Sequence, residues 1–322
     1  MPSRLSRRKF LAGIGAIGAA ATVGPRALAL PLGAHGAAKH KLPLGFSTLG
    51  CPAWSWEKIL DFAEQYGFPG VELRGLQGNM DLPTCPEFSP SRLEQSKKDV
   101  AAHGLHISSV DTDAIMDEPD PQKQEVQLAN ARRFIDLAAL LDAPYIRVFG
   151  NQIVGTPEEA SARVAKSLRE LGDYAGPKKV TVLIESHGDF VHSPMLLDIF
   201  KQADSPHVGL LWDANHTYVL GGEDPAFTVS KVGKYIHHTH LKDSVGKGDQ
   251  THYVLTGRGD VPVKEQVQQL VDIGYKGYFS YEWEKAWHPD LEDPSIAFPE
   301  YAKVMTQYLK DAYAHRHKQP SA

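Results

Sequence analysis

The sequence predicts a single-domain (β/α)8 barrel of the α/β class, and three observations lead to this prediction. Short apolar runs typical of strands alternate with longer amphipathic stretches along most of the 322 residues. Eight such runs fall within about 270 residues, the usual size of one barrel. Several runs end in an ionisable residue, as expected where barrel strands form an active site. An open doubly wound sheet is disfavoured, because no G-x-G-x-x-G follows the first strand.

The predicted strands and helices follow one another in alternation. The strands are Leu44–Thr48, Gly70–Leu73, Ile107–Asp111, Tyr145–Phe149, Val180–Glu185, Val208–Asp213, Tyr235–Leu241 and Tyr278–Glu282. The helices are Ser55–Tyr66, Gln122–Leu141, Pro157–Tyr174, Val263–Ile273 and Ala297–Tyr313. Ser55 and Thr156 are expected to cap the helices that follow them. Gly67, Gly104 and Gly274 are expected to end helices in left-handed backbone.

The N-terminus indicates an export signal. Ser6-Arg7-Arg8-Lys9-Phe10-Leu11 is a twin-arginine motif, and a Gly/Ala-rich stretch leads from it to a small-residue cleavage site at Ala27-Leu28-Ala29. This stretch is too short and glycine-rich for a spanning helix of about 20 residues. We expect a signal peptide over 1–29, a flexible leader over 30–43, the barrel over 44–315 and a polar tail over 316–322. The protein would then be periplasmic or secreted, with the twin-arginine translocase as its export partner and no membrane contact after cleavage.

The charge balance argues against binding to nucleic acid. The chain has 34 Lys+Arg and 39 Asp+Glu. Cleavage after Ala29 would remove five basic residues and no acidic residue, which leaves a formal net charge of −10. A chain so acidic is repelled by phosphate backbones unless it carries a local basic patch.

The two cysteines, Cys51 and Cys85, are too few for a disulfide scaffold. Both are expected in loops at one end of the fold, where an oxidising compartment would let them pair. A disulfide and two free thiols are therefore both open alternatives.

Four residues end successive predicted strands with groups that bind metals. They are Glu185, Asp213, His240 and Glu282. A buried carboxylate or imidazole is costly unless something compensates it, and the carboxyl ends of barrel strands meet at one mouth. We therefore predict one divalent ion held by all four; separate salt bridges around the rim are the alternative. Carboxylate and imidazole ligands without thiolate suit Mn²⁺, which we expect first, or Mg²⁺, Co²⁺ or Zn²⁺.

Residues near the predicted ligands are candidates for substrate binding, because side chains two apart share a face of a strand. The candidates are Glu72, Arg147, His187, His216, His238 and Lys242. For His187, His238 and Lys242, plain hydrogen bonding at the rim is an equal alternative. His216 either binds substrate or supports a ligand. Glu284 is expected to be a solvated acid at the end of its strand.

The chain resembles the sugar phosphate isomerase/epimerase superfamily of xylose-isomerase-like TIM barrels. The resemblance runs from about Leu44 to Leu309 and rests on four motifs, which are Ile-Glu185-Ser-His187, Trp-Asp213-Ala-Asn-His216, His238-Thr-His240-Leu-Lys242-Asp243 and Tyr-Glu282-Trp-Glu284. It implies an ion that binds two adjacent oxygens of a polyol or ketosugar, acidifies the C–H beside a carbonyl and stabilises the resulting enediolate. Glu185 and Glu282 would also be the catalytic base and acid on opposite sides of the substrate.

The same resemblance implies roles for other residues. His187 and His216 would hold substrate oxygens, and Lys242 or Arg147 would stabilise negative charge. The segment from Leu255 to Pro262 resembles the family's glycine-rich loop, with Arg258 where a glutamate is common. This loop either reaches the substrate or is an ordinary turn. Barrels of this family often form homodimers, so a dimer is possible here.

The predicted function is a metal-dependent isomerase or epimerase acting on a small sugar, polyol or keto-sugar. Val191 and Gly246 stand where ketose 3-epimerases carry a glutamate and an arginine. The alternative is therefore a lyase or hydratase acting on 3-keto-sugars or 3-keto-glycosides. DNA repair as in endonuclease IV is disfavoured, because no histidine ends the first two strands. A non-enzymatic periplasmic sugar-binding protein is disfavoured by the complete ligand set.

Overall fold

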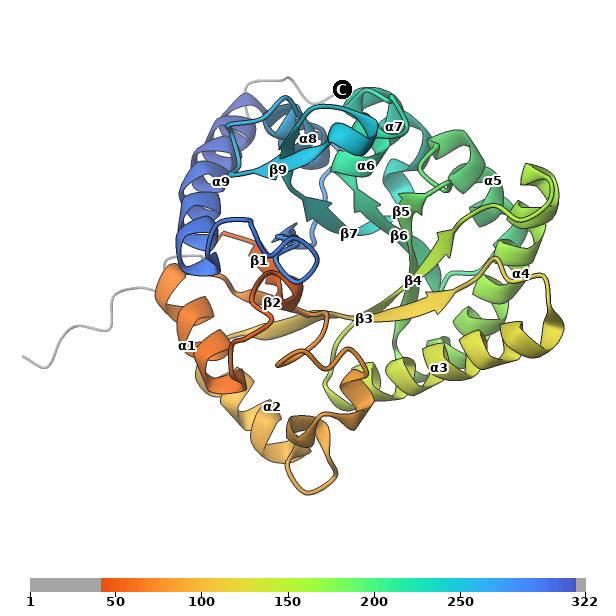
Figure 1. Cartoon of the computed structure of the whole chain (residues 1–322), viewed down its shortest axis with the longest axis horizontal. Coiled ribbons are helices and arrows are strands. Elements are labelled where there is room, and N and C mark those ends of the chain that lie inside the picture. Colours follow the sequence, from red (N-terminus) through yellow and green to blue (C-terminus); the bar gives the residue numbers. More distant parts are fainter. Residues whose placement is uncertain (1–41, 317–322) are drawn as a thin grey trace, which may run out of the picture. The chain divides into compact units, whose positions relative to one another are not determined.

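Eight parallel strands close into a barrel in the computed structural model, which describes residues 42–316 (Figure 1). The ring runs β1, β2, β3, β4, β5, β6, β7 and β10, and β10 pairs with β1 to close it. The bounds are β1 Leu44–Ser47, β2 Gly70–Leu73, β3 His106–Ile115, β4 Tyr145–Asn151, β5 Thr181–Gly188, β6 Val208–Asp213, β7 Ile236–Leu241 and β10 Phe279–Tyr281. The predicted fold class is confirmed. The predicted export signal lies outside the described residues.

Helices alternate with the strands and surround the barrel (Figure 1). Their bounds are α1 Trp56–Tyr66, α2 Leu93–Ala102, α3 Pro121–Leu140, α4 Pro157–Ala175, α5 Ser193–Ala203, α6 Ala214–Val219, α7 Pro225–Val232, α8 Val263–Asp272 and α9 Pro294–Arg316. No bounds were predicted for α2, α5, α6 or α7, although a helix was expected to end at Gly104, just after α2. The helices α6 and α7 are too short for a helical period to show, and α2 carries few apolar residues. Among the described residues, no helix is long and apolar enough to cross a bilayer.

Local chemistry explains where the predicted helices begin and end. Ser55 accepts a hydrogen bond from the backbone of the first turn of α1. At the start of α4, the Thr156 side chain accepts from the Glu159 backbone while the Glu159 carboxylate accepts from the Thr156 backbone. The three glycines predicted to end helices have positive φ, at Gly67, Gly104 and Gly274. These caps are confirmed.

The seam at which the barrel closes is held by aromatic packing onto α9. Tyr281 of β10 stacks on Tyr301 of α9 with ring centroids 4.3 Å apart. Phe46 of β1 packs on Phe298 of the same helix at 4.5 Å. All four rings are buried, and each such side chain stabilises the fold by about 1.5–3 kcal/mol. The last helix therefore fixes the first strand against the last one.

Three strands run further toward the barrel mouth than predicted. The strand β3 ends at Ile115, β4 at Asn151 and β5 at Gly188. A two-stranded hairpin of β8 Asp243–Val245 and β9 His252–Val254 follows β7 at the same end. The extended strands and this hairpin therefore surround the residues predicted to form the site.

Both cysteines are free and buried. Burial raises the pKa of Cys51 far above its ordinary value and raises the pKa of Cys85 to about 11. Of the two alternatives left open by the sequence, the unpaired one is observed.

Candidate metal centre

The four predicted ligands come together at the mouth of the barrel. Glu185 lies in β5, Asp213 ends β6, His240 lies in β7, and Glu282 directly follows β10. Each offers one ligand atom, and these atoms all lie within 4.8 Å of one another. The Nδ1 atom of His240 is 3.2 Å from Glu185 Oε1 and 3.2 Å from Glu282 Oε1. All four side chains are buried, so they face one another rather than solvent.

The three carboxylates of this cluster concentrate negative charge in a buried place. Burial would raise the pKa of Glu185, but Arg147 and then His240 outweigh burial and bring that pKa to about 2. Burial likewise opposes ionisation of Glu282, yet His240 and Lys242 hold its pKa well below the usual range. Burial favours neutral His240, but Glu282 and Glu72 raise its pKa well above the ordinary value. Glu185 and Glu282 therefore each lie beside cationic side chains, as expected of a cluster that can bind a cation.

Lys242 lies inside the cluster and pairs with three acids. Its Nζ is 2.7 Å from Asp213 Oδ2 and 2.8 Å from Glu284 Oε1, and it also donates to Glu282. Burial would lower the pKa of Lys242, but Asp213 and Glu282 raise it well above the ordinary value. The prediction of a solvated Glu284 is wrong, because its carboxylate points inward to this ammonium.

Arg147 is the second buried cation of the site. Its Nε lies 3.2 Å from Glu185 Oε2 and 3.5 Å from Asp111 Oδ2, and its guanidinium carbon is 3.9 Å from the centroid of the Phe149 ring. Its Nε and Nη1 atoms have no hydrogen-bond partner although they are buried. Arg147 therefore keeps N–H groups that can donate to a ligand beside Glu185. Its neighbour Asp111 is also buried, and burial and then the charge of Glu72 raise the pKa of Asp111 to about 7.

A cavity of about 80 Å³ opens beside these residues. Its lining includes Arg147, Glu185, His187, His216 and Glu282, together with Arg74, Glu284 and Trp287. Burial lowers the pKa of His187, so this ring is neutral at pH 7 and offers one donor and one acceptor nitrogen. His216 Nδ1 lies 3.1 Å from Asp213 Oδ2. The cavity is smaller than the roughly 300 Å³ at which ligand pockets usually begin.

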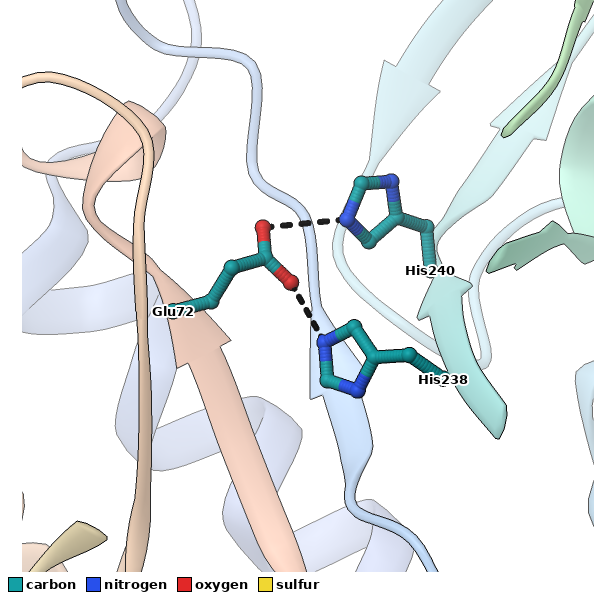
Figure 2. A group of neighbouring side chains, drawn as sticks. All are labelled: Glu72, His238 and His240. Atoms are coloured by element: carbon teal, nitrogen blue, oxygen red, sulfur yellow. Dashed lines mark hydrogen bonds and ion pairs between the residues drawn. The ribbon is translucent and has the colours of Figure 1, made fainter. Parts of the chain in front are cut away.

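Four predicted substrate-binding residues do not line this cavity, namely Glu72, His238, Lys242 and Arg258. Lys242 is fully buried among Asp213, Glu282 and Glu284. Glu72 and His238 are fully buried and pair with each other, as Figure 2 shows. Arg258 is largely exposed and pairs with Glu300 of α9 at 3.2 Å. For Glu72 and His238 the predicted face of the strand is correct, but their depth within the barrel was not predicted.

Asp243 has a role that sequence reasoning did not assign. Its carboxylate accepts hydrogen bonds from four backbone N–H groups, those of Ser244, Gly257, Gly259 and Val261, at 2.8–3.2 Å. A Cβ on Gly259 would lie 2.2 Å from Asp243 Oδ1, so only glycine fits there. Asp243 thus holds the glycine-rich loop against β8. Its position directly after Lys242 was visible in the sequence, but its distant backbone partners were not.

Known proteins similar to this chain share its fold. The family model described as "Xylose isomerase-like TIM barrel" matches residues 60–305. Fructoselysine 3-epimerase of Shigella flexneri is 23% identical over 251 residues, which cover 74% of this chain and 88% of that protein.

Two solved structures extend the comparison. The probable 3-DHS dehydratase AsbF of Bacillus anthracis is 18% identical with a TM-score of 0.68, and the match covers 82% of this chain and 99% of that one. A xylose isomerase-like TIM barrel protein of Mycobacterium smegmatis, solved in complex with magnesium, is 21% identical with a TM-score of 0.64, covering 85% and 98%. The relatives thus include a sugar epimerase and a dehydratase.

Proposed function

Because the chain belongs to the xylose isomerase-like TIM barrel family, we propose that it is a divalent-metal-dependent isomerase or epimerase of a small sugar, polyol or keto-sugar. The observation that carries this proposal is the convergence of Glu185, Asp213, His240 and Glu282 in one buried cluster. Three carboxylates and an imidazole are ligands that Mn²⁺ accepts, with Mg²⁺, Co²⁺ and Zn²⁺ as alternatives. Glu185 Oε2 is buried, accepts no hydrogen bond and has only an ion pair to Arg147 Nε at 3.2 Å, so it can also bind a cation.

The ion, when bound, would hold two adjacent substrate oxygens and acidify the C–H beside the carbonyl. Glu185 is ionised at neutral pH, so its carboxylate can accept that proton. Glu282 comes from a different strand. After it has taken up a proton from solvent, it would deliver that proton to the other face of the same carbon, while the abstracted proton stays on Glu185 until it is released to solvent. Arg147, with its unpartnered donors, would stabilise negative charge on a substrate oxygen, and neutral His187 would hydrogen-bond to another.

The test is turnover of a panel of free ketoses, inososes and 3-keto-glycosides, followed by NMR in D₂O. An epimerase or isomerase exchanges a carbon-bound proton for deuterium without losing a group. The Glu282→Gln variant should lose turnover while remaining folded by circular dichroism. If wild-type protein still exchanges the carbon-bound proton for deuterium after complete removal of divalent ions, the proposed mechanism is refuted.

A lyase or hydratase acting on 3-keto-sugars or 3-keto-glycosides is the second candidate. Val191 is buried and Gly246 has a φ of 81°, so neither position offers the charged substrate contact of a ketose 3-epimerase. The similarity to a dehydratase also favours this candidate. The same NMR experiment separates the two, because elimination releases an aglycone or water and forms an unsaturated product.

We also propose that the protein is exported through the twin-arginine route. The support is the motif Ser6-Arg7-Arg8-Lys9-Phe10-Leu11 and the cleavage site ending at Ala29. Replacing both arginines, Arg7→Lys with Arg8→Lys, should retain the precursor in the cytoplasm, and cell fractionation would detect this. Unchanged appearance of the cleaved chain in the periplasm would refute this route.

A further inference from the structure

A second layer of polar residues lies beneath the metal centre. Glu72 of β2 faces His238 and His240 of β7 across the barrel, as Figure 2 shows. Glu72 Oε1 is 3.0 Å from His240 Nε2, and Glu72 Oε2 is 2.6 Å from His238 Nε2. All three residues are 0% exposed. A buried charged layer of this kind is costly unless each member is satisfied, so its contacts require an explanation.

His240 belongs to both layers, because its two ring nitrogens face opposite partners. The Nε2 atom faces Glu72, whereas Nδ1 faces Glu185 and Glu282 in the metal centre. An imidazole that binds an ion through one nitrogen keeps a proton only on the other nitrogen, and the group beside that second nitrogen holds this proton. A carboxylate beside Nε2 retains the proton there.

We propose that Glu72 is a positioning residue for the metal centre: it holds the Nε2 proton of His240 and thereby directs the Nδ1 lone pair at the ion. This inference rests on the proposed function, because it assigns Glu72 a task toward the proposed ion. Carboxylate partners of this kind fix the ring of a ligating histidine and increase its basicity.

The surroundings of Glu72 keep its carboxylate fixed. Ser280 Oγ donates to Glu72 Oε2 at 3.2 Å, beside the contact from His238. Each carboxylate oxygen is therefore occupied by an imidazole N–H. Although Glu72, His238 and His240 lie close enough to hold an ion themselves, an ion there would have to displace both of these protons. The hydrogen-bonded arrangement favours a support for one ion over a site for a second ion.

The first experiment measures metal affinity directly. Ion-free wild type and the Glu72→Gln variant are titrated with Mn²⁺ by calorimetry. We expect one ion per chain in both proteins, with affinity about 10–100-fold weaker in the variant. Glu223→Gln is the matched control, since Glu223 is a buried carboxylate that accepts from Ser193 and Thr228 and contacts none of the ligands. It should lower stability without changing the affinity for Mn²⁺.

The second experiment observes the proton itself. In the Zn²⁺-loaded protein labelled with ¹⁵N-histidine, His240 should show a hydrogen-bonded Nε2–H resonance that shifts or disappears in Glu72→Gln. If that variant does not fold, Ser280→Ala keeps the charge of Glu72 and removes one hydrogen bond. It should weaken Mn²⁺ binding by about twofold to tenfold.

Three results would decide against the inference or its premise. Wild-type Mn²⁺ affinity in Glu72→Gln, with an unchanged Nε2–H resonance, would overturn the role of Glu72 alone. Two ions per wild-type chain would overturn it in favour of a second metal site at Glu72. Absence of any ion from folded wild type would instead refute the metal centre of the proposed function.

Discussion

Replacing Lys242 by methionine tests whether a buried ammonium balances the acids of the site. Lys242 pairs with Asp213, Glu282 and Glu284 and is 0% exposed. Methionine keeps much of the volume and removes the charge. Removing one partner of a buried ion pair costs about 3–5 kcal/mol, because the remaining charges stay desolvated. For a domain of this size, we expect the Tm of ion-free protein to fall by about 6–20 °C.

The same substitution should strengthen metal binding. The ammonium competes with the ion for Asp213 Oδ2, and two unit charges 4 Å apart interact by about 4 kcal/mol at an effective dielectric constant of 20. We expect the affinity for Mn²⁺ to rise about tenfold or more in Lys242→Met. Saturating Mn²⁺ should therefore raise the Tm of Lys242→Met by more than it raises the Tm of wild type.

The pH dependence follows from the direction of the shift. The pKa of Lys242 is raised in the folded state, so its stabilisation is complete below the unfolded lysine pKa of about 10.4 and is lost only as pH rises through the folded value. The difference in Tm should therefore be present throughout pH 6–9.

Differential scanning calorimetry with and without Mn²⁺ measures both effects. The control is Lys264→Met, which breaks an exposed ion pair to Asp311 and should change little. Equal Tm values for ion-free wild type and Lys242→Met, or weaker Mn²⁺ binding in the variant, would refute the argument from charge.

Three further predictions follow from the fold and the site. Gly188→Ala should destabilise the protein by about 1–3 kcal/mol in urea unfolding, because Gly188 has a φ of 61° and an added Cβ would lie 2.2 Å from the Asn151 carbonyl oxygen; wild-type stability would contradict the described end of β5. Ellman's reagent should react with neither Cys51 nor Cys85 in folded protein and with both in protein unfolded by guanidinium. If neither thiol reacts in unfolded protein that has not been treated with a reductant, the two cysteines form a disulfide. Dialysis against EDTA should lower Tm and abolish turnover, with both restored by Mn²⁺; indifference of both to the chelator would count against the metal centre.

The fold and the cluster of ligands were accessible from the sequence because their signals are local. Strand alternation, apolar runs and caps involve residues within a few positions of one another. In a barrel, one end of every strand meets the others, so a local observation at Glu185 or Asp213 also predicts long-range proximity. Helix α5 has the apolar spacing of a buried face and could have been found in the same way.

The depth and partners of side chains were not accessible in this way. His238 shares a face with His240, but a residue two positions earlier lies one layer deeper, so it meets Glu72 instead of the cavity. Glu284 was expected in solvent because its partner Lys242 comes from another strand. Such pairings depend on the stagger of strands around the barrel, which no short stretch of sequence encodes.

The carboxylate of Asp243 has a consequence for how this enzyme family can diversify. Because it accepts hydrogen bonds from backbone amides, it fixes the path of the segment up to Val261 without a hydrogen bond to any side chain of that segment. Arg258 sits on this segment and points outward. Substitutions of Arg258 can therefore accumulate without disturbing strand β7, so this part of the surface can vary independently of the residues of the site.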